Sequence, residues 1–272
     1  MGYTVRRLSS VLGAEIAGID VAEVGDNLFN ELHQVWLDHN GVLIFRDQRL
    51  TPEQHLAFSR RFGALLPHNL PEFELPGMPD IFHFRIDPVP DDVPKERSIR
   101  NGSGWHAAHT YEKELSGASL TYAIEIAPRG GDMFFANTTA AYEALSAPIQ
   151  RMLGELRAIH RRAGALVHKD GDDVWAEHPV VYRHPETGRA ALFVNPSFTS
   201  EIVGLSADES KAILGFLFQH TARPEFTYRH NWRINDLLVW DDRCNLHYHL
   251  SDYTGGGRVV LNRTSASAAG RI

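Results

Sequence analysis

Hydrophobic residues recur at helical spacing in four stretches of the chain. Within 26–39, apolar side chains return every three or four positions, which is the period of one helix face. Thr51 is followed by Pro52, and Ser206 is followed three residues later by Glu209, and both patterns are typical of helix starts. We therefore predict helices over 26–39, 52–62, 140–156 (broken near Pro148) and from 207 through at least 217.

Shorter runs rich in β-branched and aromatic residues fill much of the remaining chain, bounded by Gly, Pro, Asp or Asn. Since these runs do not alternate regularly with helices, a doubly wound parallel sheet is disfavoured. The pattern favours a mainly β fold, either an antiparallel barrel or a double-sheet jelly roll, with helices packed outside it. The predicted strands are 42–45, 120–126, 132–135, 180–182, 191–194, 226–228, 237–240 and 259–261.

One long stretch, 67–104, has neither pattern. Its first part, 67–90, carries repeated prolines, and its second part, 91–104, is polar and charged. Compact domains keep loops of this length mainly where the loops serve a site. We predict that 67–104 forms a lid and substrate loops over an active site.

The composition narrows the class of protein. A net charge of −7, with no Lys/Arg-rich block to neutralise phosphates, excludes nucleic acid as a partner. No apolar run approaches the roughly 20 residues that span a bilayer, so no membrane partner is expected. The single cysteine, Cys244, fits a reducing compartment, and we expect the cytoplasm. No internal repeat or linker-like shift divides the 272 residues, which predicts one domain over 1–272 and leaves homo-oligomerisation open.

Several common chemistries have no motif in this chain. It contains no phosphate-binding loop, no dinucleotide-binding glycine pattern, no G-x-S-x-G elbow, no H-E-x-x-H and no paired C-x-x-C. Cys244 precedes His247 by three residues and could act as a nucleophile, but we favour the role of a small buried apolar side chain for it.

Two histidine segments remain. The first is GWHAAHTY over 104–111, and the second is VWDDRCNLH over 239–247, which Arg258 follows. With fifteen histidines in the chain, one histidine alone carries little weight, so the argument rests on spacing and surroundings.

Together with other motifs, these segments resemble the TauD/TfdA family of iron(II)/2-oxoglutarate oxygenases, named after taurine dioxygenase and 2,4-D dioxygenase. The resemblance spans nearly the whole chain. Its further motifs are GID at 18–20, VLIFRDQ at 42–48, LAFSRRFG at 56–63, PRGGD at 128–132, AAYEAL at 140–145 and HPETG at 184–188. The resemblance implies a double-stranded β-helix, that is, a jelly-roll core.

The resemblance also implies a metal centre. The family reads W-H-x-D in the first segment, and its His and Asp join a distant His to hold iron(II). Residues i and i+2 of an extended chain point the same way, so one short segment can provide two ligands. His106 and His247 are then the metal histidines. Three protein ligands leave three positions open, two for 2-oxoglutarate and one for O₂.

Two arginines follow His247. By resemblance, Arg258 binds the distal carboxylate of 2-oxoglutarate, a task that suits the two parallel hydrogen bonds of a guanidinium. Arg263 is the alternative, because the pattern read back from Arg263 is one residue longer than the family's usual spacing.

The sequence departs from the family at two positions. Ala108 stands where the family has the metal-binding Asp, so the ligand position is vacant. Met133 stands where a Thr hydroxyl usually helps to hold 2-oxoglutarate, and a thioether donates no hydrogen bond.

Three interpretations of Ala108 compete. In the first, an ordinary hydroxylase has lost a ligand, naturally or by engineering. In the second, chloride or bromide fills the vacant position, as in the related halogenases that carry Ala or Gly there. In the third, His109 becomes a third nitrogen ligand, which needs a local turn because His109 faces away from His106 on an extended segment. The two departures also leave open a non-enzymatic interpretation, in which the barrel binds a small acid without oxidising it.

The substrate candidates are His68, Asn101, Trp105 and His109. His68 falls where taurine dioxygenase uses a histidine toward its sulfonate, which suits a small anionic substrate. We therefore predict an enzyme that uses Fe(II), 2-oxoglutarate and O₂ to oxidise a C–H bond of a small, anionic molecule, with release of succinate and CO₂. Halogenation is the rival outcome, and a silent binding barrel is the third.

Overall fold

The computed structural model describes residues 2–68, 70–87, 104–162, 173–250, 252 and 257–269. Its described helices are α1 (Asp26–Asp38), α2 (Pro52–Ser59), α3 (Thr138–Glu143), α4 (Ala147–Leu153) and α5 (Ala207–Thr221). Its described strands are β1 (Thr4–Arg7), β2 (Ala14–Ala17), β3 (Val42–Phe45), β4 (Glu74–Leu75), β5 (Met78–Ile86), β6 (Ser116–Glu125), β7 (Met133–Asn137), β8 (Arg157–Arg161), β9 (Trp175–Pro179), β10 (Val181–Arg183), β11 (Ala190–Leu192), β12 (Thr199–Ile202), β13 (Thr227–His230), β14 (Leu237–Asp241), β15 (Asn245–His249) and β16 (Val259–Ser267).

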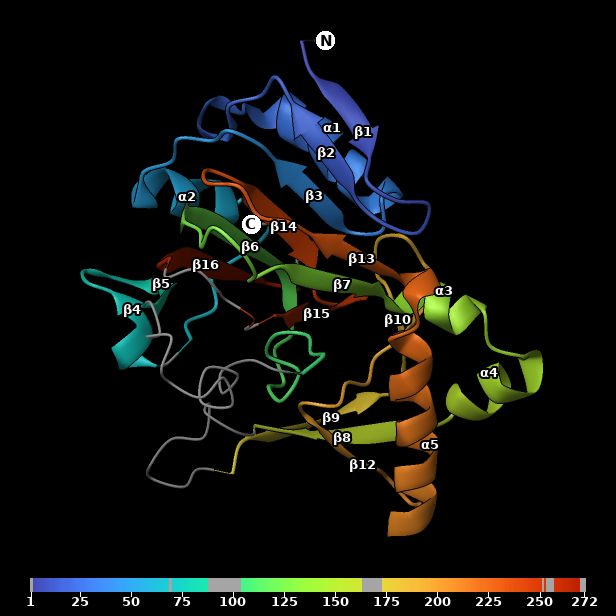
Figure 1. Ribbon diagram of the computed structural model, residues 1–272. Coiled ribbons are helices and arrows are strands. Elements are labelled where there is room, and N and C mark those ends of the chain that lie inside the picture. The colour runs from blue at the N-terminus through green and yellow to red at the C-terminus, as the bar shows by residue number, and fades with distance from the viewer. Residues whose placement is uncertain are drawn as a thin grey trace.

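The largest sheet has eight strands in the order β1-β2-β3-β14-β6-β16-β5-β4 (Figure 1). All four residues of β3 are buried, because both faces of the sheet are covered. Leu43 and Phe45 pack with α1 and α2, whereas Val42 and Ile44 face the barrel interior. This division follows from the alternation of side chains along a strand.

A second sheet closes the core from the other side. It has the order β13-β7-β15, and Phe135 of β7 packs against Trp240 of β14 with ring centroids 5.6 Å apart. The two sheets thus enclose one apolar cluster between them, the double-sheet arrangement of a jelly roll. The predicted fold class, mainly β with helices outside, is confirmed.

A smaller layer lies beside this core. The sheet β12-β8-β9 and helices α3 to α5 contribute to a separate apolar cluster, which includes Leu153, Leu192 and Leu217. Figure 1 shows α5 beside β8 and β12, running across the direction of these strands. In the part of the chain that the structure describes, no helix is long and apolar enough to cross a membrane.

The predicted helices are confirmed, including the break between α3 and α4, and 42–45 matches β3. The prediction of a loop throughout 67–90 was wrong, because β4 and β5 lie within it. The repeated prolines of this stretch hid the strand pattern of the nine-residue segment Met78–Ile86 from the sequence analysis. The remainder of the predicted lid, 88–103, lies outside the described residues.

Candidate metal centre

The structure brings His106 and His247 together. The two residues exchange backbone hydrogen bonds, His106 N to His247 O at 3.0 Å and His247 N to His106 O at 2.8 Å. Residues paired in this way across antiparallel strands project their side chains to the same face. The centroids of the two imidazoles are accordingly 4.0 Å apart.

The free nitrogens of these rings suit a metal ion. His106 Nδ1 donates to the carbonyl of Gly104 at 2.8 Å, which leaves a lone pair on Nε2. Neither ring nitrogen of His247 has a hydrogen-bond partner among the described residues, and buried polar atoms normally have one. Burial lowers the pKa of His106 to about 4 and that of His247 well below its usual value. Both imidazoles are therefore neutral near pH 7, the form that binds metal.

No third protein ligand completes the set within the described residues. The one group of three His, Cys, Asp or Glu side chains with ligand atoms within 4.8 Å of one another is His184, Asp241 and Cys244. His109 does lie in a turn, with φ of +56°, but its ring faces His68 at 5.4 Å between centroids. The geometry therefore gives no support to His109 as a third ligand.

The group His184, Asp241 and Cys244 is held together by protein contacts instead. His184 Nδ1 accepts from the backbone N–H groups of Glu186 and Thr187, so its Nε2 carries the hydrogen that Asp241 accepts at 2.9 Å. Arg243 donates twice more to Asp241 from Nε and a terminal nitrogen. Burial raises the pKa of the Cys244 thiol well above its usual value. Protein contacts thus occupy both ring nitrogens of His184 and both carboxylate oxygens of Asp241, which indicates a structural role for the group.

The two arginines lie on opposite sides of the sheet. Arg263 shares the interior face of β16 with Val259 and Leu261. Its side chain is partly buried, and it donates to Ser119 Oγ at 3.0 Å. The side chain of Arg258 is 44% exposed and forms ion pairs with Asp87 at 3.3 Å and Glu125 at 3.6 Å. Positions five apart on a strand face opposite ways, so the structure brings Arg263, and not Arg258, toward the two histidines.

Of the other predicted site residues, two lie near Arg263 and the others do not or lie outside the described residues. His68 and His109 face each other, and Arg263 is close enough to both to lower their pKa values beyond the larger effect of burial. Trp105 packs on the opposite face from His106, with Ala107, Ala136 and Leu246. Met133 is buried in the core. Asn101 lies outside the described residues.

The sequence analysis missed several neighbours of the pair. Phe198 meets the His106 ring edge-on at 5.8 Å, and Tyr111 packs against Phe198. Asp242 is buried at the end of β14, with the nearest oxygen 3.9 Å from His247 Nδ1. A charged residue next to the fully apolar stretch of β14 was the available signal for Asp242.

Comparison with known proteins identifies the family and supports the fold. The family described as "Taurine catabolism dioxygenase TauD, TfdA family" matches residues 4–265. The chain is 31% identical over 264 residues to (S)-phenoxypropionate/alpha-ketoglutarate-dioxygenase of Sphingobium herbicidovorans, covering 90% of this chain and 88% of the relative. It is 34% identical over 268 residues to a longer Schizosaccharomyces pombe protein, with 92% of this chain and 66% of that relative covered. The crystal structure of a taurine dioxygenase from Burkholderia xenovorans superimposes with a TM-score of 0.84 at 34% identity, over 98% of this chain and 90% of that chain.

Proposed function

Since this chain belongs to the TauD/TfdA family of dioxygenases, we propose that it oxidises a C–H bond of a small anionic molecule with 2-oxoglutarate and O₂. The observation that carries the proposal is the pair of the partly buried His106 and the buried His247, whose rings lie 4.0 Å apart with metal-binding nitrogens free. Succinate and CO₂ are the coproducts that this chemistry requires. We propose that the whole chain, 1–272, acts as one catalytic domain.

His106 and His247 would hold Fe(II) through their neutral imidazoles. Iron(II) held there would supply the activation of O₂, which is the oxidant of both 2-oxoglutarate and the substrate. The protein's part is to orient the two imidazoles and to keep water out. The hydrogen bond from His106 to Gly104 fixes one ring, and Trp240 and Phe198 pack against the pair.

Arg263 is the residue that we propose binds a carboxylate in the site. Its Nε is buried and has no hydrogen-bond partner among the described residues, and arginine keeps its charge in proteins. The carboxylate is either the distal group of 2-oxoglutarate or an acid group of the substrate. Arg258, which the family pattern favours for 2-oxoglutarate, is engaged at the surface by Asp87 and Glu125.

The substrate side offers hydrogen-bond donors rather than further positive charge. Burial lowers the pKa of His109 to about 3 and that of His68 well below its usual value, so both rings are neutral and can each donate one hydrogen bond. His68 Nε2 is buried without a partner among the described residues. A carboxylate or sulfonate matches Arg263 together with these donors. Taurine and phenoxypropionate, which name the compared relatives, carry a sulfonate and a carboxylate respectively.

Halogenation is the second candidate, and the vacancy at Ala108 favours it. Ala108 is 8% exposed, and no His, Cys, Asp or Glu of the described chain completes a three-ligand group with the two histidines. An exogenous halide would find that position free. Chloride is therefore a variable of the test, as a candidate cosubstrate.

The test uses anaerobically purified protein with Fe(II), 2-oxoglutarate and a panel of small carboxylates and sulfonates, exposed to O₂ with and without chloride. Succinate release and product mass are measured. Substrate-dependent succinate with an oxygenated product supports the proposal, and a chlorinated product replaces it with halogenation. Binding without turnover leaves a silent barrel and overturns both. His106→Ala should abolish turnover, whereas His39→Ala, at the end of α1, is the matched control.

A further inference from the structure

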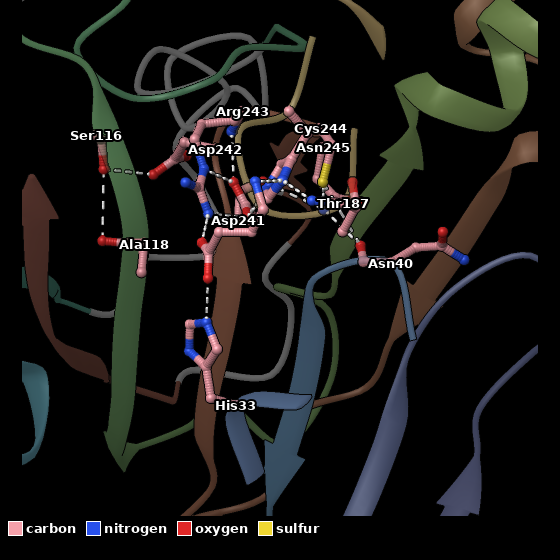
Figure 2. A network of polar contacts seen from close by, with 12 residues as sticks. His33, Asn40, Ser116, Ala118, Thr187, Asp241, Asp242, Arg243, Cys244 and Asn245 are labelled. Carbon is pink, nitrogen blue, oxygen red and sulfur yellow. Dashed lines mark hydrogen bonds and ion pairs between the residues drawn. The ribbon is translucent and has the colours of Figure 1, made fainter. Parts of the chain in front are cut away.

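A buried carboxylate lies directly behind the vacant ligand position. The side chain of Asp242 is 1% exposed. Its Oδ1 accepts from the backbone N–H of Ala108 at 3.1 Å and from Trp240 Nε1 at 3.0 Å. Its Oδ2 accepts from the hydroxyls of Ser116 at 2.7 Å and Ser119 at 2.6 Å, the first of which is visible in Figure 2. Four donors thus converge on this carboxylate.

The same carboxylate faces the back of the His247 ring. Asp242 Oδ1 lies 3.9 Å from His247 Nδ1, which is too far for a hydrogen bond but close enough for the carboxylate to act on the dipole of the neutral ring in a buried site. A negative charge on this side favours a hydrogen on Nδ1 and leaves the Nε2 lone pair for a metal. Arg263 joins the same network, because it donates to the Ser119 hydroxyl that donates to Asp242.

The charge balance of the centre makes Asp242 important. Two neutral imidazoles contribute no negative charge to a divalent ion, and Ala108 contributes none. Burying a cation without a counter-charge costs free energy. A carboxylate that lies behind a metal ligand lowers this cost without contacting the ion.

Resting on the proposed function, we infer that Asp242 compensates for the missing ligand. It supplies from behind His247 the negative charge that Ala108 does not, and so sets the metal affinity of a two-histidine centre. Asp242 is a positioning residue and not a ligand, since it forms no three-ligand group with His106 and His247.

The first test is Asp242→Asn, which removes the charge and keeps the shape. The fold can accept it, because the hydroxyls of Ser116 and Ser119 have other acceptors at 3.4 Å in the Ala118 carbonyl and the Ser265 hydroxyl. Mn²⁺ affinity is measured from the EPR signal of free Mn²⁺, and thermal unfolding monitors the fold. We expect affinity to fall about 10- to 100-fold, the range for outer-shell partners of metal ligands. Ser116→Ala, which keeps the charge and removes one hydrogen bond, should retain most of the affinity.

The second test leaves Asp242 untouched. Ala108→Asp and Ala108→Asn each add an oxygen ligand at the vacant position, with and without charge. If Asp242 already supplies the charge, both variants should bind Mn²⁺ with similar affinity, and Ala108→Asp should gain much more over its parent in the Asp242→Asn background. A double-mutant cycle isolates that difference.

The outcomes separate this inference from the proposed function. Undiminished Mn²⁺ binding by folded Asp242→Asn overturns the inference alone, as does a much tighter Ala108→Asp than Ala108→Asn in the native background. The inference is also overturned if Asp242→Asn lowers the Mn²⁺ affinity equally in the native chain and in the Ala108→Asp variant. Failure of the unaltered protein to bind Mn²⁺ overturns the metal centre itself.

Discussion

Trp240 packs against His247, with the centroids of the two rings 4.9 Å apart and their planes inclined by 56°. The guanidinium carbon of Arg263 lies 5.1 Å from the centroid of the same indole, and the indole N–H donates to Asp242. Trp240 therefore contacts the candidate metal ligand His247, the cationic side chain of Arg263 and the buried carboxylate of Asp242.

The hydrogen bond from Trp240 to Asp242 should contribute measurably to stability. We expect Trp240→Phe to lower the free energy of unfolding by about 1.5–3 kcal/mol more than Trp232→Phe does, the range for a hydrogen bond to a charged group. Trp232 is the matched control, because it belongs to the same apolar cluster and its Nε1 has no partner among the described residues. Urea denaturation measures both variants, and equal losses would refute the prediction.

Restoring a carboxylate at position 108 should strengthen the metal centre. We expect Ala108→Asp to tighten Mn²⁺ binding by about tenfold, equivalent to about 1.4 kcal/mol, because a third ligand is added beside His106 and His247. If the chain is a hydroxylase that lost a ligand, substrate hydroxylation should rise as well. Calorimetric titration with Mn²⁺ and product mass measure the two effects. A weaker metal affinity in the folded variant would contradict this expectation.

Substitutions of Arg258 and Arg263 should have different effects on KM. Arg263→Gln removes the partly buried guanidinium, and we expect at least a tenfold rise in KM for whichever acid it binds, about 1.4 kcal/mol. Arg258→Gln should leave both KM values nearly unchanged, since its ion pairs lie at the surface. Initial rates with 2-oxoglutarate and substrate varied in turn identify the acid. The reverse result, with Arg258→Gln the damaging change, would restore the family assignment.

The interaction of Glu186 with His33 should appear in the acid stability of the fold. The hydrogen bond from His33 Nε2 at 2.6 Å, together with the smaller effect of Arg243, lowers the pKa of Glu186 from 4.5 to about 2. Because the folded pKa is depressed, the stabilisation is complete above pH 4.5 and is lost as the pH falls toward about 2. The stability gap between the native chain and Glu186→Gln should therefore close over that window in denaturation curves. A gap that is constant with pH would count against this linkage.

Much of the scaffold could be predicted because burial leaves a clear pattern. Val42–Phe45 is apolar on both faces since both are covered, and Thr51 and Ser206 cap their helices through the predicted capping boxes. The strand β15 escaped prediction because its sequence NLHYH is polar. Its polar residues face the candidate metal centre, so the residues that the site requires replace the apolar pattern that would have predicted a strand.

The site was harder, because long-range register decides it. His106 and His247 could be paired from family motifs, and their backbone bridge brings them together. The contact of Asp242 with Ala108 joins residues 134 positions apart, and no local pattern signals it. The choice between Arg258 and Arg263 depended on the direction in which each side chain points, one just before β16 and one within it.

That choice has a consequence for how chains of this kind diverge. Arg258 and Arg263 are five residues apart, so a pleated strand offers one to the interior and one to solvent; a spacing of four would turn both the same way. Adding or deleting a single amino acid between them could thus exchange the cation presented to an incoming acid. Recognition would change through chain length alone, while both arginines persisted in the gene.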